Sequence, residues 1–175
     1  MTRMTKALLM VLLMTSAACT RPDRFGGDDG STAGPGTTAG ATNQVVPGSA
    51  DDPNSPLYFS QRVGDRVFFA VDTATLTPEG RATLDGQAQW LASNSDYLAI
   101  IEGHADEQGT REYNLALGAR RANTVREYLV SRGVNSARLR TISYGKERPV
   151  EVCADEACYS KNRRAVTIIS ATGTS

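Results

Sequence analysis

Residues 97–129 read YLAIIEGHADEQGTREYNLALGARRANTVREYL. The first part, Tyr97–Glu102, combines aromatic and β-branched residues and predicts a strand. A polar turn, Gly103–Asp106, follows it. Apolar residues then recur at helical spacing until Gly133, a residue type that commonly ends helices. They are Leu115, Ala119, Ala122, Val125 and Leu129. The stretch therefore predicts a strand, a polar turn and a long amphipathic helix.

The same alternation extends to both sides of this stretch. β-rich runs at residues 66–71, 138–144 and 165–169 predict three further strands. Thr77 and Pro78 form a helix start, with Thr as N-cap and Pro at the first helical position. Leu84, Ala88 and Leu91 follow at helical spacing. We therefore expect an α/β sandwich, in which helices pack on one face of a small mixed sheet of about four strands.

The N-terminus has the pattern of a secretory signal. Arg3 and Lys6 precede an apolar run at residues 7–14, and small residues lead to Cys19. The run is too short to span a bilayer, which needs about 20 apolar residues. The alternative, a buried helix, would need an amphipathic continuation, and none follows.

Cys19 directly follows two alanines and resembles the cysteine of a bacterial lipobox, where the thiol is diacylated and the signal is cut before it. Ser16 departs from the pattern, because Leu is commonest there. Thr20 is not the Asp that tends to retain lipoproteins at the inner membrane. We therefore expect residues 1–18 to be the signal and Cys19 to anchor the chain in the outer membrane, with the folded domain in the periplasm.

Residues 19–54 are predicted to form the lipidated N-terminus and a flexible tether. Gly, Pro, Thr, Ser, Ala and Asp dominate the segment, and its only aromatic residue is Phe25. Such a composition cannot bury enough apolar surface to offset the entropy of ordering. Fully extended, the tether could reach on the order of 110 Å. Residues 55–175 are then the folded domain.

The charge balance gives no support to nucleic-acid binding. The 175 residues include 19 Lys+Arg and 19 Asp+Glu, so no net charge points to such a partner. Arg120, Arg121 and Arg126 could form a basic stripe. Glu112 and Glu127 interrupt it, and no aromatic residues interleave with it for stacking on bases.

Four motifs occur in order along the predicted domain. They are IEGHADEQGTREYNLALGARR at 101–121, ANTVREYL at 122–129, ISYGKERP at 142–149 and SKNRRAV at 160–166. Together they closely resemble the peptidoglycan-associated lipoproteins over about residues 64–170. The C-terminal part of OmpA and flagellar stator proteins share this domain.

The resemblance implies non-covalent binding of peptidoglycan within the Tol–Pal system, without a cofactor or an enzymatic reaction. It also implies TolB as a protein partner, with TolA as a second candidate. The corresponding cellular role is outer-membrane integrity and invagination during cell division.

The ligand implied by the resemblance is the zwitterionic end of diaminopimelate in the peptidoglycan stem peptide. The family's ligand-binding Asp and Arg fall on Asp106 and Arg121. A carboxylate suits the ammonium, and the planar guanidinium can donate two parallel hydrogen bonds to the carboxylate. Many relatives have Phe-Asp-x-Asp where this chain has Phe69-Ala70-Val71-Asp72, so only Asp72 is assigned a role there.

Another interpretation gives both residues ordinary roles. Asp106 would cap a helix or form a salt bridge, and Arg121 would be a surface charge. Neither residue belongs to the apolar pattern of its element. We therefore expect alanine at either position to leave the fold intact.

The remaining polar motifs predict structural roles. His104 is the only histidine and has no cysteine or second histidine nearby, which makes a poor metal site. We expect it to form a hydrogen bond at the strand end. In the Asn162-Arg163-Arg164 motif, Asn162 is expected to cap, and an arginine to pair with acids beneath the site.

Cys153 and Cys158 lie in a predicted polar loop, EVCADEACYS. Behind a secretory signal they predict a disulfide, which would stabilise by roughly 2 kcal/mol because the closed loop is short. A catalytic Cys–His pair would need His104 beside one of these thiols and an orienting acid. Two other functions compete with peptidoglycan binding. The enzyme alternative is a cell-wall hydrolase, and the third hypothesis is a structural lipoprotein without a ligand.

Overall fold

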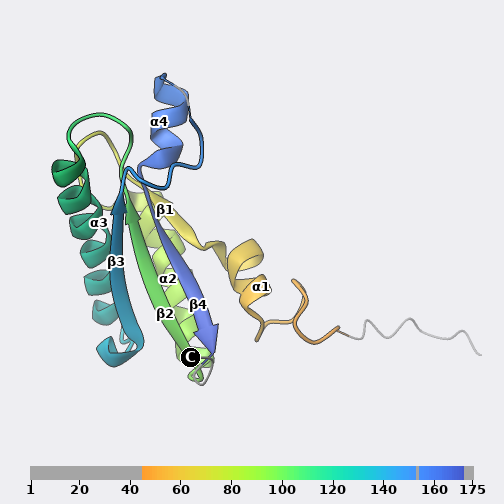
Figure 1. The fold of residues 1–175 in the computed structure, drawn as a ribbon. Helices are drawn as coiled ribbons and strands as arrows, with labels where there is room; N and C mark the ends of the chain where they lie inside the picture. Colours follow the sequence, from red (N-terminus) through yellow and green to blue (C-terminus); the bar gives the residue numbers. More distant parts are fainter. Residues whose placement is uncertain (1–44, 153, 172–175) are drawn as a thin grey trace, which may run out of the picture. The chain divides into compact units, whose positions relative to one another are not determined.

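The computed structural model describes residues 45–152 and 154–171. Its centre is a four-stranded sheet in the order β1 (Arg66–Phe68), β4 (Arg164–Ala171), β2 (Tyr97–His104) and β3 (Leu139–Gly145). Strand β4 runs antiparallel to both of its neighbours, and β2 pairs with β3 in parallel. Helices α2 (Pro78–Ser93) and α3 (Arg111–Ser131) cover one face (Figure 1). The predicted α/β sandwich with a four-stranded mixed sheet is confirmed.

Side chains alternate between the two faces of the sheet, and the apolar core lies on the face that the helices cover. Ala99 and Ile101 of β2 are fully buried against the helices, where Leu84 and Val125 contribute the facing apolar surface. Side chains of the opposite face are open to solvent, and Ile168 is 42% exposed. This pattern is expected for a sheet that buries one face only.

Strand β1 is shorter than the predicted run 66–71. Phe69 still donates its N–H to Arg163 O, at 2.9 Å. Asp72 adopts a left-handed conformation with φ 54°. Few non-glycine residues do so, and this one turns the chain out of the strand direction. The prediction therefore missed a turn that begins immediately after Phe69.

Helix α3 ends at Ser131, close to Gly133, as the sequence predicts. The Thr110 side chain caps it by accepting a hydrogen bond from Tyr113 N at 3.2 Å, and Gly133 follows its end with φ 95°. The predicted buried face was partly wrong, because Leu115 is 48% exposed while Leu117 is buried. A close contact between this helix and β2 sets its rotation instead.

That contact joins backbone to backbone. A Cβ atom built on Gly103 of β2 would lie 1.8 Å from the carbonyl oxygen of Gly118 on α3. Only two glycines can approach this closely. The Ser143 hydroxyl of β3 donates to Leu115 O, at 2.6 Å, beside the same contact. Helix α3 is thereby fixed against the end of β2, with Arg121 about one turn beyond the contact.

Residues 45–54, which we expected to belong to the flexible tether, are held on the domain. The Trp90 indole N–H donates to Pro53 O at 2.7 Å, and the Tyr97 hydroxyl donates to Asn54 O at 3.1 Å. Helix α1 (Pro56–Tyr58) and the π-helical turn η1 (Phe59–Gly64) then lead into β1. An aromatic side chain of α2 and the first residue of β2 thus bind the end of this segment, just before the predicted domain boundary.

Residues 156–162, predicted as part of a polar loop, form helix α4 (Glu156–Asn162). Asp155 caps it by accepting a hydrogen bond from Cys158 N at 3.0 Å. Cys158 is buried, whereas Cys153 lies outside the described residues, so their pairing stays a prediction. The short helix η2 (Ser136–Arg138) precedes β3. None of the described helices combines the length and apolar character needed to cross a bilayer.

Candidate functional site

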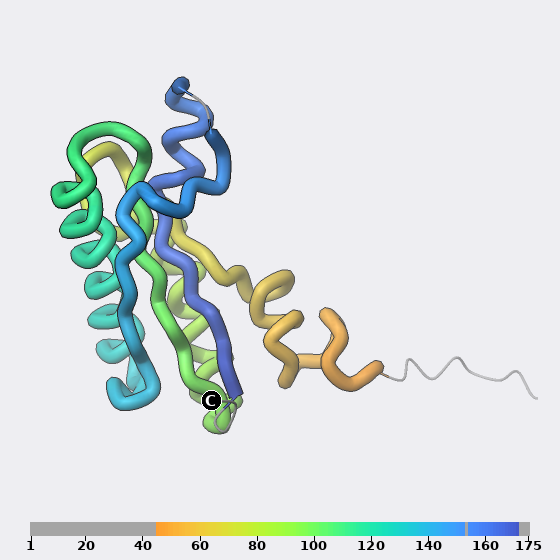
Figure 2. The backbone as a smooth tube through the Cα atoms, viewed as in Figure 1, coloured from red at the N-terminus to blue at the C-terminus, as the bar shows by residue number. Residues whose placement is uncertain are grey.

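Three connections meet at one end of the sheet: residues 69–77, 105–110 and 146–155 (Figure 2). Ala105 N donates to Gly145 O at 2.8 Å, which joins the ends of β2 and β3. Lys146 reaches across from the end of β3, and its ammonium donates to Gly109 O at 2.7 Å. The predicted site residues lie at this end of the domain.

Arg121 lies beneath the three connections and is fully buried. Its guanidinium donates to three backbone carbonyls: Thr73 O at 2.8 Å, His104 O at 2.8 Å and Ala70 O at 3.1 Å. It also lies over the Phe69 ring, 5.1 Å from the centroid. Arg121 therefore ties the segment after β1 to the end of β2.

This placement shows that the interpretation of Arg121 as a surface charge is wrong. It also gives a physical reason to expect that alanine at this position would destabilise the fold instead of leaving it intact. Burial lowers the pKa of Arg121 to about 10, an effect that the nearby Asp106 carboxylate opposes. The guanidinium therefore stays charged at neutral pH. Three of its five N–H groups are used, which leaves two for another acceptor.

Asp106 pairs with Arg163 rather than directly with Arg121. One Asp106 oxygen accepts from Arg163 Nη1 at 3.1 Å, and the other accepts from Gln108 N at 3.3 Å. Both side chains of this ion pair are more than 90% buried. Arg163 also bonds Glu156 on α4 and donates to Phe69 O at 3.2 Å. The expected pairing of an arginine with acids beneath the site is confirmed.

Glu156 and Arg163 reinforce one another's charge. The hydrogen bond from Glu156 raises the pKa of Arg163 above its ordinary value, and the same bond lowers the pKa of Glu156. The site thus contains two buried guanidinium groups, Arg121 and Arg163, near one buried carboxylate, Asp106. Arg163 is already paired with two carboxylates, so Arg121 is the guanidinium that remains for an anionic group of a ligand.

Asn162 fastens the loop that precedes α4. Its side-chain oxygen accepts from Val150 N at 2.8 Å, and its amide donates to Glu151 O at 2.8 Å and to Glu107 Oε1 at 2.6 Å. This buried residue therefore caps backbone groups of a loop. It ties the connection after β3 to the connection after β2.

Asp72 lies at the exposed rim of the site. Its carboxylate accepts a hydrogen bond from the Tyr113 hydroxyl of α3. Asp72 belongs to the segment that Arg121 holds from below, and its charge, like that of Asp106, raises the pKa of Arg121. Sequence reasoning missed Tyr113, Lys146 and Glu156. The quoted motifs include Tyr113 and Lys146 and so gave a signal for both, whereas Glu156 lies outside them.

His104 is buried at the end of β2, and its expected hydrogen bond is not found. Both ring nitrogens are without a partner in the described structure, and the nearest carboxylate oxygen, of Glu102, lies 3.7 Å from Nε2. The ring stacks on Tyr144 at 5.6 Å. Burial, then the charges of Arg164 and Arg148, lower the pKa of His104 to about 4. His104 is therefore neutral at physiological pH.

The neutral state of His104 predicts a loss of stability in acid. Its folded pKa of about 4 lies below the ordinary 6.5, so the unfolded chain takes up a proton first as the pH falls. Its contribution is complete above pH 6.5, and roughly 3 kcal/mol is lost by pH 4. Denaturant unfolding of the wild type and of His104→Leu at both pH values measures this. An equal pH dependence in the two proteins would contradict the assignment.

In chemical terms the site offers buried, charged hydrogen-bonding groups beneath the three connections. Within the described ranges no group of three or more His, Cys, Asp or Glu residues could hold a metal ion. The arrangement can recognise a ligand that carries both an ammonium and a carboxylate.

Comparisons with known proteins give one consistent result. The model of the OmpA family matches residues 68–163. The peptidoglycan-associated lipoprotein of Rhizobium meliloti is 51% identical over 166 residues, which cover 95% of this chain and 88% of the relative. That of Pseudomonas aeruginosa is 38% identical, with coverage of 90% and 92%.

Solved structures give the same answer. The crystal structure of the peptidoglycan-associated lipoprotein from Burkholderia pseudomallei matches with a TM-score of 0.62 and 40% identity, covering 69% of this chain and 98% of that one. The C-terminal domain of Helicobacter pylori MotB matches with a TM-score of 0.58 and 21% identity, covering 62% and 86%. The second match supports the fold alone.

Proposed function

This chain belongs to the peptidoglycan-associated lipoproteins of the OmpA family, and from that premise we propose that it holds peptidoglycan non-covalently and links it to the outer membrane. The observation that carries the proposal is the buried cluster of Asp106, Arg121 and Arg163 beneath three connections. Buried charges are costly, and ionisable groups in such perturbed environments cluster at functional sites. No bond of the ligand is broken in this role.

The proposed ligand is the zwitterionic end of diaminopimelate in a stem peptide. Asp106, which is 7% exposed, would accept hydrogen bonds from the ammonium. Arg121 would donate its two unused N–H groups to the carboxylate, with the charge of Arg163 close by. Because Arg121 is 0% exposed, the ligand reaches it only when the segment that carries Asp72 shifts outward. Asp72 at the rim is a candidate for a weaker contact.

Asp106→Asn is the sharpest test of this ligand. The amide oxygen can still accept from Arg163, so the fold should persist while the charge that attracts the ammonium is lost. Binding of a diaminopimelate-containing stem peptide should weaken roughly ten- to a hundredfold, since a hydrogen bond to a charged group contributes about 1.5–3 kcal/mol. Calorimetric titration measures the effect.

Asp85→Asn is the matched control, because Asp85 pairs with Arg132 at 2.8 Å on the exposed side of the helices. It should bind like the wild type. Amidating the diaminopimelate carboxylate should also weaken binding to the unchanged protein. Wild-type affinity of a folded Asp106→Asn protein would place the site elsewhere.

The membrane link rests on residues outside the described structure. Residues 1–18 are proposed as the signal, and Cys19 as the lipid-carrying mature N-terminus. The family membership and the charge, apolar run and small residues before Cys19 support this. Mass spectrometry of the mature N-terminus decides it, and an unmodified Cys19 in the membrane fraction contradicts the anchor.

The same membership supports a place in the Tol–Pal system, with TolB as partner and TolA as a second candidate. Support of outer-membrane integrity and of invagination during division would follow from such a link. Co-purification of TolB with the lipidated chain is the corresponding measurement. A disulfide between Cys153 and Cys158 is part of the proposal for a domain in an oxidising compartment.

A further inference from the structure

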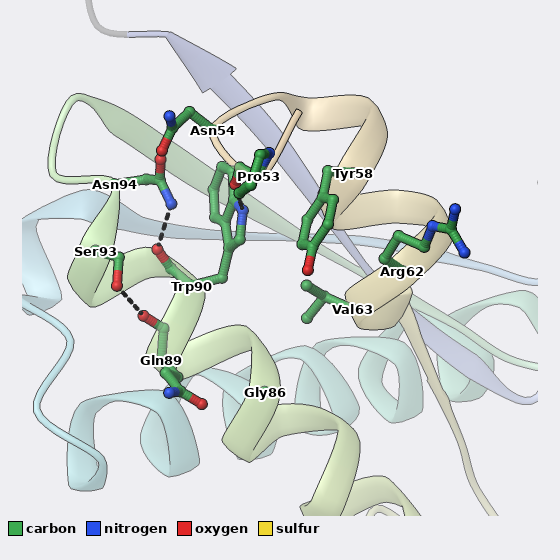
Figure 3. A pocket seen from close by; sticks show the side chains of 10 residues that line it. All are labelled: Pro53, Asn54, Tyr58, Arg62, Val63, Gly86, Gln89, Trp90, Ser93 and Asn94. Atoms are coloured by element: carbon green, nitrogen blue, oxygen red, sulfur yellow. Dashed lines mark hydrogen bonds between the residues drawn. The ribbon is translucent and has the colours of Figure 1, made fainter. Parts of the chain in front are cut away.

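A groove of about 460 Å³ lies where the N-terminal segment crosses α2, away from the cluster of Asp106 and Arg121 (Figure 3). Its lining includes the half-buried ring of Tyr58 on α1, Gly86 of α2, and Trp90, which is largely buried at 6% exposure. A volume of this size accommodates a small ligand. Nothing in the proposed stem-peptide site uses these residues.

The Trp90 side of the groove is held in place by its contacts. The Trp90 indole is held by its hydrogen bond to Pro53 O, at 2.7 Å, and by the Phe59 ring, at 4.9 Å between centroids. Gly86 opens the groove because it has no side chain, although a glycine in a helix interior costs up to about 1 kcal/mol relative to alanine. Side chains that are already held in place bind a ligand with little loss of conformational entropy.

The rim is polar and nearly neutral. The Gln89 and Asn54 side chains are exposed and make no hydrogen bond within the described structure. The only charged lining residue is Arg62, whose charge Asp51 already pairs at 2.7 Å. The Tyr58 ring beside unused amides suits a neutral ligand with an apolar face and hydrogen-bonding groups at its edge. A pyranose ring with an acetamido group has this character, and a zwitterionic peptide does not.

We propose that this groove binds an N-acetylated sugar ring of the peptidoglycan glycan strand. The inference rests on the proposed function and adds a second contact to it. Tyr97, which bonds Asn54 beside the groove, begins β2, and Asp106 follows the end of that strand. The two contacts are therefore about 23 Å apart. A polymer engaged at both points is retained more strongly than at either alone.

Tryptophan fluorescence reports on the groove directly, because Trp90 is the only tryptophan in the chain. The complete chain is titrated with glycan fragments from which the stem peptides have been removed, and the emission of Trp90 is followed. We expect a saturable change. Gln89→Ala and Tyr58→Leu should each weaken the binding at least about tenfold.

Gln61→Ala is the matched control, since Gln61 is exposed on η1 and does not line the groove. It should titrate like the wild type. Asp106→Asn should lose the stem peptide and keep the glycan response, which separates a failure of this inference from a failure of the proposed function. No saturable response, an unchanged response in Gln89→Ala, or a response to sugars of outer-membrane glycolipids alone overturns the proposal.

Discussion

Replacing Arg121 with alanine is expected to lower the free energy of unfolding by roughly 3–5 kcal/mol. The guanidinium is fully buried and donates to the carbonyls of Thr73, His104 and Ala70. Alanine leaves these three acceptors without their donor and opens a cavity above Phe69. Such a loss is a large share of the 5–15 kcal/mol typical of a domain. Denaturant unfolding, followed by circular dichroism, measures it.

Arg121→Lys distinguishes the shape of the donor from its charge. A lysine keeps the positive charge but lacks the planar fork that spans three carbonyls, so it should recover less than half of the lost stability. Arg120→Ala is the control, because Arg120 is exposed on the same helix. It should change the unfolding free energy by less than about 0.5 kcal/mol. Near-wild-type stability of Arg121→Ala would show that these bonds do not hold the connections together.

Gly103→Ala should be at least as damaging to the fold, with a loss of about 3 kcal/mol or more. The new Cβ atom would lie 1.8 Å from the Gly118 carbonyl oxygen and 3.2 Å from the Ala122 Cβ. Backbone on both sides cannot yield in the way that a flexible side chain can. Helix α3 must therefore move off β2, and Arg121 moves with it. The midpoint of thermal or denaturant unfolding reports the loss, and the share of soluble protein reports a failure to fold.

Gly86→Ala serves as the matched glycine control. Its added Cβ would meet Val63 Cγ1 at 3.4 Å, an ordinary contact, and it lies inside a helix. It should be neutral or stabilising by up to about 1 kcal/mol. Equal stability of Gly103→Ala and the wild type would mean that α3 can approach the sheet differently.

The elements that the sequence predicted are those coded by local signals. Thr77 with Pro78 marks the start of α2, and Gly133 marks the end of α3. Helix α4 was missed because its apolar content is small, although its Asp155 cap is local. The wrong part of the predicted α3 face has another cause: the Gly103–Gly118 contact rotates the helix, and no periodicity within the helix contains that information.

The same limit applies to the candidate site. Asp106 and Arg121 were found through the family motif, and an arginine of the Asn162-Arg163-Arg164 motif was expected to pair with acids there. The backbone carbonyls that Arg121 binds were not foreseen. The ion pair of Asp106 with Arg163 spans 57 residues, and Arg121 reaches carbonyls 48 and 51 residues away. Such distant contacts depend on the completed sheet. The sequence therefore identified the charged residues of the site, but it did not predict that the Arg121 side chain is buried.

The position of the N-terminal segment has a mechanical consequence. Under the proposed function, tension from the membrane enters the domain through residues 45–54 and passes along the chain into β1 at Arg66. The wall pulls on the opposite end, where Arg163 leads into β4. Strand β1 pairs with β4 antiparallel, with Phe68 opposite Arg164. The pull therefore runs along the strands and across their hydrogen bonds. These bonds must be sheared together instead of opened singly, so the domain resists force best along the axis on which the cell envelope would load it.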